Sequence, residues 1–511
     1  MKTQSNRLTF SQQFFIATML FGLFFGAGNL IFPIFLGSQA GRNVWPAIVG
    51  LLITGVGIPL LGVAAQGISR SNGLQEMAGR VSPRYSIFFT CALYLTIGPF
   101  FAIPRCASTS FTVGIEPLLG ENVNATVLLA AFSCVFFAAV LFFSLRPGKI
   151  LTWVGKLLTP LFLLVLAILV VTALLHPTDR ITDMTPSAAY ATAPFFAGFL
   201  EGYNTMDALA SLAFGIVVIN VIRGLGVTEP GAIAKNTVLS GIFSCLFMGG
   251  IYVAVTIVGA QSHSLTVSCT NGGEAFAVIA EHYLGRAGLV VLALTVILAC
   301  LKTSIGLVTS CAETFTAMFP NGPKYGFWAT CFSIFSLLVT NIGLNAIIAI
   351  SLPVLMFLFP LAITLILLAL LGNLYGHDTV VYRWVTGFTL VAALFDFVKA
   401  LPKAITETPV VSAVIGFGQG MQPVVGYNYG AERYDRVKQA ALFSIRFCTA
   451  ILTVLALLGA VFAPQVIAFF RNDPQVIDIG TRAFRYQCIS LPLGAVLVFA
   501  NMLFQSVGKY W

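Results

Sequence analysis

Apolar segments of about 20 residues, long enough to cross a bilayer as helices, recur along this chain. Hydrophobic residues make up 58% of its 511 residues and charged residues 9%, against roughly 25% charged residues in soluble domains. Because lipid offers no hydrogen-bond partners to backbone groups, such segments cross a membrane as helices. The sequence therefore predicts an all-α, polytopic membrane protein with about 14 transmembrane helices.

Two of these apolar segments are interrupted by glycine and polar residues. The first is MLFGLFFGAGNLIFP at residues 19–33, and the second is FLEGYNTMDALA at residues 199–210. Each segment opens a block of five predicted spans. Paired breaks at matching places in two halves are typical of secondary transporters, in which unwound helices line the substrate site. The pattern predicts a carrier.

Residues 1–405 resemble the branched-chain amino acid:cation symporters of the BrnQ type. The matching motifs are GAGNLIFP at 26–33, GPFFAIPR at 98–105, EGYNTMD at 201–207, NGGE at 271–274 and CLKTSIG at 300–306. The resemblance implies a LeuT-like fold with two inverted repeats of five helices, in which the first helix breaks near Gly26 and the sixth near Gly202. It also implies import of leucine, isoleucine and valine, driven by a gradient of Na⁺ or H⁺.

The chain changes character after residue 405. A glycine-rich run with a basic loop, GFGQGMQPVVGYNYGAERYDRVK at 416–438, resembles the multidrug and toxic-compound extrusion (MATE) transporters. We therefore expect an eleven-span carrier domain at 1–405 and a three-helix, MATE-like partial segment at 406–511. The alternatives are a drug/cation antiporter of the MATE type and a non-functional fusion product.

The substrate site is expected where the two breaks meet. Glycines let the backbone open at low steric cost, and free amides facing the start of a half-helix can bind a carboxylate. The predicted substrate-binding residues are Gly26, Ala27, Gly28, Asn29, Gly202, Tyr203, Asn204 and Thr205. Two alternatives are that the glycines serve close helix packing and that the polar residues of the sixth span form a structural cluster.

The family resemblance places a cation site between the first break and the eighth span. Its expected members are the carbonyls of Gly22 and Phe25 together with Cys300, Thr303 and Ser304. Hydroxyl and carbonyl oxygens suit a hard cation such as Na⁺. Alternatively, the two hydroxyls bond back to carbonyls four residues earlier.

Two basic residues near these sites have open roles. Lys302 could replace the cation and shift coupling to protons, or it could point away, pair with Glu313 or extend to the interface; the second interpretation is favoured and no role is assigned. Arg105 could sense the substrate, pair with a charge at the gate, or anchor its helix at the membrane interface.

Charge and cysteine usage set further expectations. Most lysines and arginines lie in loops, where they favour cytoplasmic N- and C-termini in a bacterial cell membrane over nucleic-acid binding. The ten cysteines and four histidines show no ligand spacing, so no cofactor and no metal other than a possible Na⁺ is expected. The sequence shows no recognisable nucleophile–base pair or phosphate-binding loop, so an enzymatic activity is not expected. The expected partners are the amino-acid substrates and membrane lipid.

Overall fold

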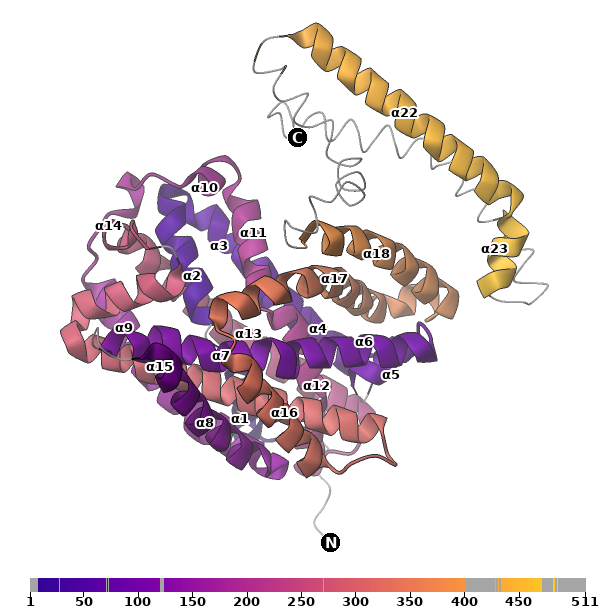
Figure 1. Cartoon of the computed structure of the whole chain (residues 1–511). Helices are drawn as coiled ribbons and strands as arrows, with labels where there is room; N and C mark the ends of the chain where they lie inside the picture. The colour runs from indigo at the N-terminus through magenta and orange to yellow at the C-terminus, as the bar shows by residue number, and fades with distance from the viewer. Residues whose placement is uncertain are drawn as a thin grey trace. The chain divides into compact units, whose positions relative to one another are not determined.

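The protein is described from a computed structural model, which places residues 8–26, 28–69, 71, 73–119, 124–269, 271–400, 428, 431, 433–470, 481–482 and 485. The chain divides into two compact units, Met1–Ala400 and Leu401–Trp511. Every regular element among the described residues is a helix (Figure 1).

The helices of the first unit are given in chain order, and its predicted division into two inverted repeats stays a prediction. Those up to residue 175 are α1 (Phe10–Phe24), α2 (Gly28–Ala40), α3 (Val44–Leu52), α4 (Ile58–Ile68), α5 (Leu74–Gly79), α6 (Pro83–Leu95), α7 (Ala102–Thr109), α8 (Ala125–Ser144) and α9 (Thr159–Leu175). Those that follow are α10 (Ala188–Thr192), α11 (Pro194–Asn204), α12 (Asp207–Gly224), α13 (Pro230–Gln261), α14 (His263–Thr266), α15 (Gly272–Met318), α16 (Tyr325–Thr340), α17 (Leu344–Leu370) and α18 (Thr379–Ala400).

Helix starts in this unit follow ordinary capping chemistry. Thr9 and Gln12 form a capping box at the start of α1, in which each side chain bonds the other residue's backbone amide. Asn271 caps α15 by accepting hydrogen bonds from the amides of Gly273 and Glu274. The NGGE motif at 271–274 therefore begins a helix.

The described residues contain eight helical runs that are long and apolar enough to cross a membrane. Two shorter apolar helices, α1 and α16, accompany them. Three of the runs include π-helical segments, such as Ile53–Gly57 between α3 and α4 and Thr96–Phe100 between α6 and α7. The predicted total of about 14 spans stays a prediction, because much of the chain after residue 400 lies outside the described residues.

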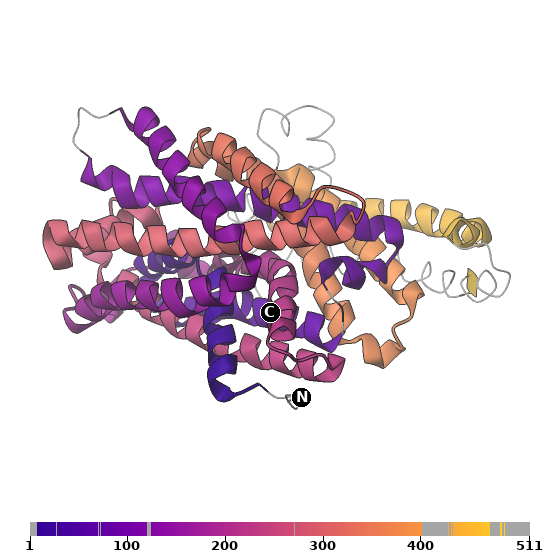
Figure 2. The same cartoon turned by 90° about the horizontal axis from the view of Figure 1, so that it is seen from below.

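Close helix contacts in the first unit depend on glycine. Helix α13 packs along α2 and α4, and α11 packs along α3 (Figures 1 and 2). A Cβ atom added at Gly198 of α11 would lie 2.0 Å from the carbonyl oxygen of Ala47 in α3. A Cβ atom added at Gly202, one turn later, would lie 1.9 Å from the hydroxyl oxygen of Thr54. The packing role that the sequence left open for these glycines is therefore present at Gly202.

The second unit is described in part. Helix α22 (Tyr434–Val461) is followed by α23 (Ala463–Phe470). Arg436 and Lys438, expected in a loop, lie in the first turns of α22. The three-helix segment expected at 406–511 stays a prediction, because most of its other residues lie outside the described residues. The proposed boundary at residue 405 stays a prediction.

Replacing Gly198 with alanine should destabilise the fold. The backbone oxygen of Ala47 cannot rotate away from the new methyl group, so α11 and α3 must separate, at a cost of about 1–3 kcal/mol. Gly250→Ala is the matched control, because a Cβ there meets nothing within 4 Å. Thermal melting in detergent should show a lower melting temperature for Gly198→Ala than for the wild type. The melting temperature of Gly250→Ala should be unchanged. Equal melting of both variants would contradict the close contact.

Candidate functional site

The first break separates α1 from α2. Phe25, the C-cap of α1, has φ −76° and ψ 86°, so the helix stops there. The amide of Gly26 donates to the carbonyl of Phe24 and to Oδ1 of Asn29, each at 2.9 Å. This amide, predicted to bind the substrate carboxylate, is therefore already used within the chain. Ala27 lies outside the described residues.

The second break separates α11 from α12 and lies at Thr205 and Met206. Met206 adopts a left-handed conformation with φ 65° and ψ 9°, which is uncommon for a residue other than glycine. The break lies near Gly202, as predicted, but Gly202 does not itself form it: Gly202 lies inside α11, where it allows close approach to Thr54. Strained residues of this kind cluster at functional sites.

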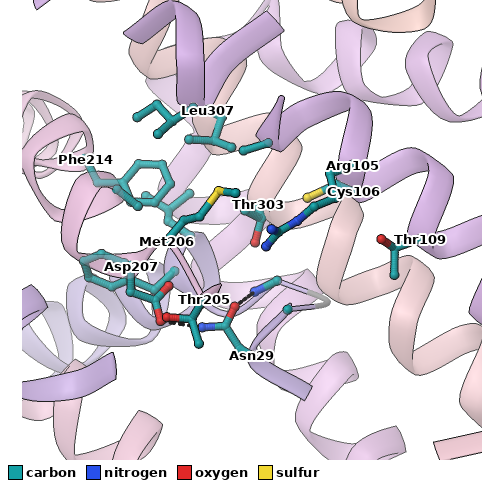
Figure 3. Close-up of a pocket in the computed structure, with 17 residues that line it drawn as sticks. Asn29, Arg105, Cys106, Thr109, Thr205, Met206, Asp207, Phe214, Thr303 and Leu307 are labelled. Carbon is teal, nitrogen blue, oxygen red and sulfur yellow. Dashed lines mark hydrogen bonds between the residues drawn. The ribbon is translucent and has the colours of Figure 1, made fainter. Parts of the chain in front are cut away.

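A buried hydrogen-bond network joins the two breaks. The side-chain amide of Asn29, in the first turn of α2, donates to Oδ2 of Asp207 at 2.7 Å and contacts the Tyr252 hydroxyl at 2.5 Å. That hydroxyl donates to the same Asp207 oxygen at 2.7 Å. Asp207 is the first residue of α12, so the network links the start of both second half-helices (Figure 3). The structure thus brings together the two interrupted segments, as the sequence predicts.

A small cavity of about 40 Å³ lies between these breaks. Five predicted residues line it, namely Gly26, Gly28, Asn29, Thr205 and Thr303. The remaining walls are mostly apolar and include Leu23, Phe24, Ile97, Ala210, Phe214 and Leu307. The cavity therefore has one polar side and one aliphatic and aromatic side (Figure 3).

Arg105 supplies a positive charge to the polar side of this cavity. Its Nη2 donates to the carbonyl oxygen of Asn204 at 3.2 Å, and its guanidinium lies 5.7 Å from the centre of the Phe32 ring. Figure 3 shows the guanidinium and the Thr303 hydroxyl directed into the same space. The interpretation of Arg105 as an interfacial anchor is wrong, since the side chain lines the cavity.

The polar residues of α11 have mixed placements. Asn204 and Tyr203 are half-buried, and neither lines the cavity with its side chain. The Asn204 amide donates to Glu201 at 3.3 Å, and the Tyr203 ring packs 5.0 Å from that of Phe359. The cluster interpretation therefore describes these residues of α11 better than direct substrate contact.

The eighth span, α15, carries three of the predicted cation-site residues, Cys300, Thr303 and Ser304. Cys300 and Ser304 are fully buried, and Thr303 is 8% exposed. A Cβ added at Gly26 would lie 3.4 Å from the Thr303 hydroxyl, so this residue faces the break. Among the described contacts, neither hydroxyl bonds back to the carbonyl four residues earlier. Thr303 therefore lies beside the first break as predicted, and the cation site stays a prediction.

Lys302 also faces the break, contrary to expectation. Its ammonium donates to the carbonyl oxygens of Gly22 at 3.1 Å and Phe25 at 2.5 Å. The expected alternative partner, Glu313, accepts a hydrogen bond from Asn220 at 2.9 Å instead. The interpretation that Lys302 points away is therefore wrong. Ending α1 at Phe24 frees carbonyls that the ammonium can reach.

Several site residues went unrecognised in the sequence. Asp207 was seen as part of a polar cluster, but its link to Tyr252 was not foreseen. Met206 gave no signal, since methionine does not mark a left-handed turn. Phe214 and Leu23 looked like ordinary span residues, and their place on the cavity wall depends on packing.

Comparison with known proteins then defines the family. The model of the branched-chain amino acid transport proteins matches residues 10–423. A branched-chain amino acid permease, BrnQ, of Lactobacillus delbrueckii subsp. lactis is 52% identical over 396 residues, which cover 78% of this chain and 89% of the relative. The chain belongs to the branched-chain amino acid transport protein family. The BrnQ permease of Bacillus subtilis, 41% identical with the same coverage, is another relative of the chain.

The C-terminal part matches a second family. The MatE family model matches residues 404–510, so the two matches overlap only near the expected junction. The predicted resemblance of the two parts to two carrier families is confirmed.

A solved transporter has a similar fold. The nucleobase-cation-symport-1 family transporter Mhp1, in a closed conformation with bromovinylhydantoin bound, aligns with a TM-score of 0.51 at 15% identity. The alignment covers 76% of this chain and 93% of Mhp1. The family member described here is therefore a helical, multi-pass membrane protein whose fold resembles that of the transporter Mhp1.

Replacing Gly28 with valine should abolish transport. The new Cβ would lie 2.9 Å from Nη2 of Arg105 and 3.2 Å from the Phe32 ring, and its two methyl groups would enter the cavity. Gly250→Val introduces the same side chain in α13, where nothing lies within 4 Å of the added Cβ. Substrate uptake should fall to background for Gly28→Val and stay near wild type for the control. Wild-type uptake by a well-expressed Gly28→Val protein would exclude the cavity as the site.

Proposed function

We propose that the protein imports leucine, isoleucine and valine across a bacterial cell membrane, coupled to a cation gradient. The observation that carries this proposal is the two-sided cavity between the helix breaks, in a chain whose relatives are named branched-chain amino acid permeases. A substrate with a charged end and a branched aliphatic side chain needs both kinds of wall. The proposed orientation has both termini in the cytoplasm.

The polar side of the cavity suits the charged groups of an amino acid. The α-carboxylate would bind the Arg105 guanidinium, with the amides in the first turn of α2 adding a favourable helix-dipole field. The α-ammonium would lie near the carboxylate of Asp207, which the hydrogen bonds from Asn29 and Tyr252 hold in place. Opposite charges at the two ends would thus fix the orientation of the substrate.

The apolar side would hold the branched side chain. Leu23, Phe214 and Leu307 offer aliphatic and aromatic surface without a hydrogen-bonding group. Burying one extra methylene there is worth about 0.8 kcal/mol, so small amino acids should bind less well than isoleucine. A charged side chain would be left without a partner on this wall.

Cation coupling is proposed to act through the neighbouring site on α1 and α15. Gly22 and Phe25 lie at the end of α1 and Cys300, Thr303 and Ser304 lie on α15, and the carbonyl and hydroxyl oxygens of these residues suit a small cation. The coupling ion in this proposal is Na⁺ or H⁺. Its binding next to the first break would favour the same helix arrangement that closes over the substrate.

A specific observation also supports a second candidate, drug/cation antiport, because residues 404–510 match the MatE family. The matched segment follows the region that forms the cavity. None of the cavity residues lies beyond Leu307. We therefore favour amino-acid import and assign the C-terminal unit no part in it.

Uptake of labelled isoleucine into proteoliposomes tests the proposal. Unlabelled leucine and valine should compete, whereas glutamate and lysine should not. Arg105→Gln should reduce uptake at least about tenfold, since a hydrogen bond to a charged group contributes about 1.5–3 kcal/mol. Arg84→Gln, the same change at an exposed position, is the control.

Two outcomes would contradict amino-acid import. One is uptake that leucine and valine fail to reduce while Arg105→Gln transports as well as Arg84→Gln. The other is resistance of cells to cationic drugs on expression of the full chain, without isoleucine uptake, which would favour the antiport alternative.

A further inference from the structure

Lys302 occupies the place where a coupling cation would be expected. It lies in α15 and is fully buried, and its Nζ donates to the Gly22 oxygen at 3.1 Å and to the Phe25 oxygen at 2.5 Å. Both carbonyls belong to the last turn of α1, where the helix dipole places partial negative charge. The ammonium thus uses the electrostatic field that a bound cation would use.

Aromatic rings complete the surroundings of this ammonium. Its Nζ lies 4.2 Å from the centre of the Phe162 ring and 5.6 Å from the centres of the Phe21 and Phe25 rings. The faces of such rings attract cations, more strongly where water is excluded. Residues from α1, α9 and α15 therefore form one enclosed cation site, and the cation in it is the Lys302 ammonium.

The titratable groups near Lys302 are thiols. Cys300 of α15 and Cys106 of α7 lie close enough to interact with its charge, and Arg105 adjoins Cys106. Among the described residues, no carboxylate forms an ion pair with Lys302. The nearest cavity carboxylate, Asp207, is bonded to Asn29 and Tyr252. The charge of Lys302 is therefore balanced by dipoles and rings.

A sodium ion would compete directly with this ammonium. Both would require the same two carbonyl oxygens, and two unit positive charges at such short range repel strongly in a buried site. A site that holds protonated Lys302 cannot hold Na⁺ on these oxygens as well. The remaining candidate for a coupling cation, which must bind and be released in each cycle, is the proton on Lys302 itself. A buried lysine, unlike arginine, can release its proton.

We propose that Lys302 carries the coupling proton, so that uptake is coupled to H⁺ and not to Na⁺. This inference rests on the proposed import of branched-chain amino acids. The neutral amine takes one proton from the outside, and the resulting ammonium binds the Gly22 and Phe25 carbonyls and ties α15 to the first break. Loss of that proton to the cytoplasm removes the charge from both hydrogen bonds and loosens the tie. One proton moves inward for each transport cycle.

The experiment uses the full chain in proteoliposomes that contain a pH-sensitive dye. External isoleucine should acidify the lumen of wild-type vesicles, and a gradient acidic outside should drive accumulation. Replacing external choline with Na⁺ should change the accumulation less than about twofold. Isoleucine exchange across vesicles loaded with isoleucine needs no net ion movement, so it reports substrate handling separately.

Lys302→Met should keep isoleucine exchange and lose both lumen acidification and pH-driven accumulation. Lys156→Met is the matched control, because Lys156 also lies over a phenylalanine ring, at 4.8 Å from the centre of Phe15, but is exposed. If Lys302→Met does not fold, Lys302→Arg replaces it; a permanently charged side chain should likewise abolish acidification.

The outcomes separate the two levels of the proposal. Accumulation driven by a Na⁺ gradient in wild-type vesicles, without acidification, would overturn the role of Lys302. Acidification that persists in Lys302→Met would overturn it as well. Absence of isoleucine exchange in wild-type vesicles would instead contradict the proposed function.

Discussion

Asn29 makes the contact on which the site depends. Its side chain accepts from the Gly26 amide in the first break and donates to Asp207 at the second. An unwound stretch in a membrane protein must satisfy its backbone groups within the protein, and a buried carboxylate must be hydrogen-bonded. The Asn29 side chain supplies one hydrogen bond to the unwound backbone, at Gly26, and one to the buried carboxylate of Asp207. The two breaks therefore stabilise each other, and the cavity lies where they meet.

The same breaks explain the placement of the charged groups. The end of α1 exposes carbonyls, which accept from Lys302, and the start of α2 exposes amides near Arg105. The end of α1 thus lies beside Lys302, and the start of α2 lies beside Arg105, which lines the cavity. In the proposed cycle, Arg105 binds the substrate and Lys302 carries the proton.

The sequence was sufficient to predict an all-helical membrane protein and the meeting of its two interrupted segments, because apolar length and glycine interruptions are local signals. It placed the first break correctly at Gly26 and predicted that Thr303 would face it. It placed the second break near Gly202 and expected that glycine to form it, whereas Met206 adopts the left-handed conformation under tertiary constraint. It also misjudged Lys302, because helical periodicity gives the angle between neighbouring side chains but does not say which of them faces α1. The Asn29–Asp207–Tyr252 network joins three separate helices and leaves no pattern in the sequence.

The central claim is that substrate binds between the two helix breaks. An experimental structure of the full chain with isoleucine bound tests this most directly. Density for the carboxylate should lie within hydrogen-bond distance of Arg105, and density for the side chain should contact Phe214 and Leu307. Isoleucine bound elsewhere, or a continuous helix through Gly26 or Met206 in the bound state, would contradict the account.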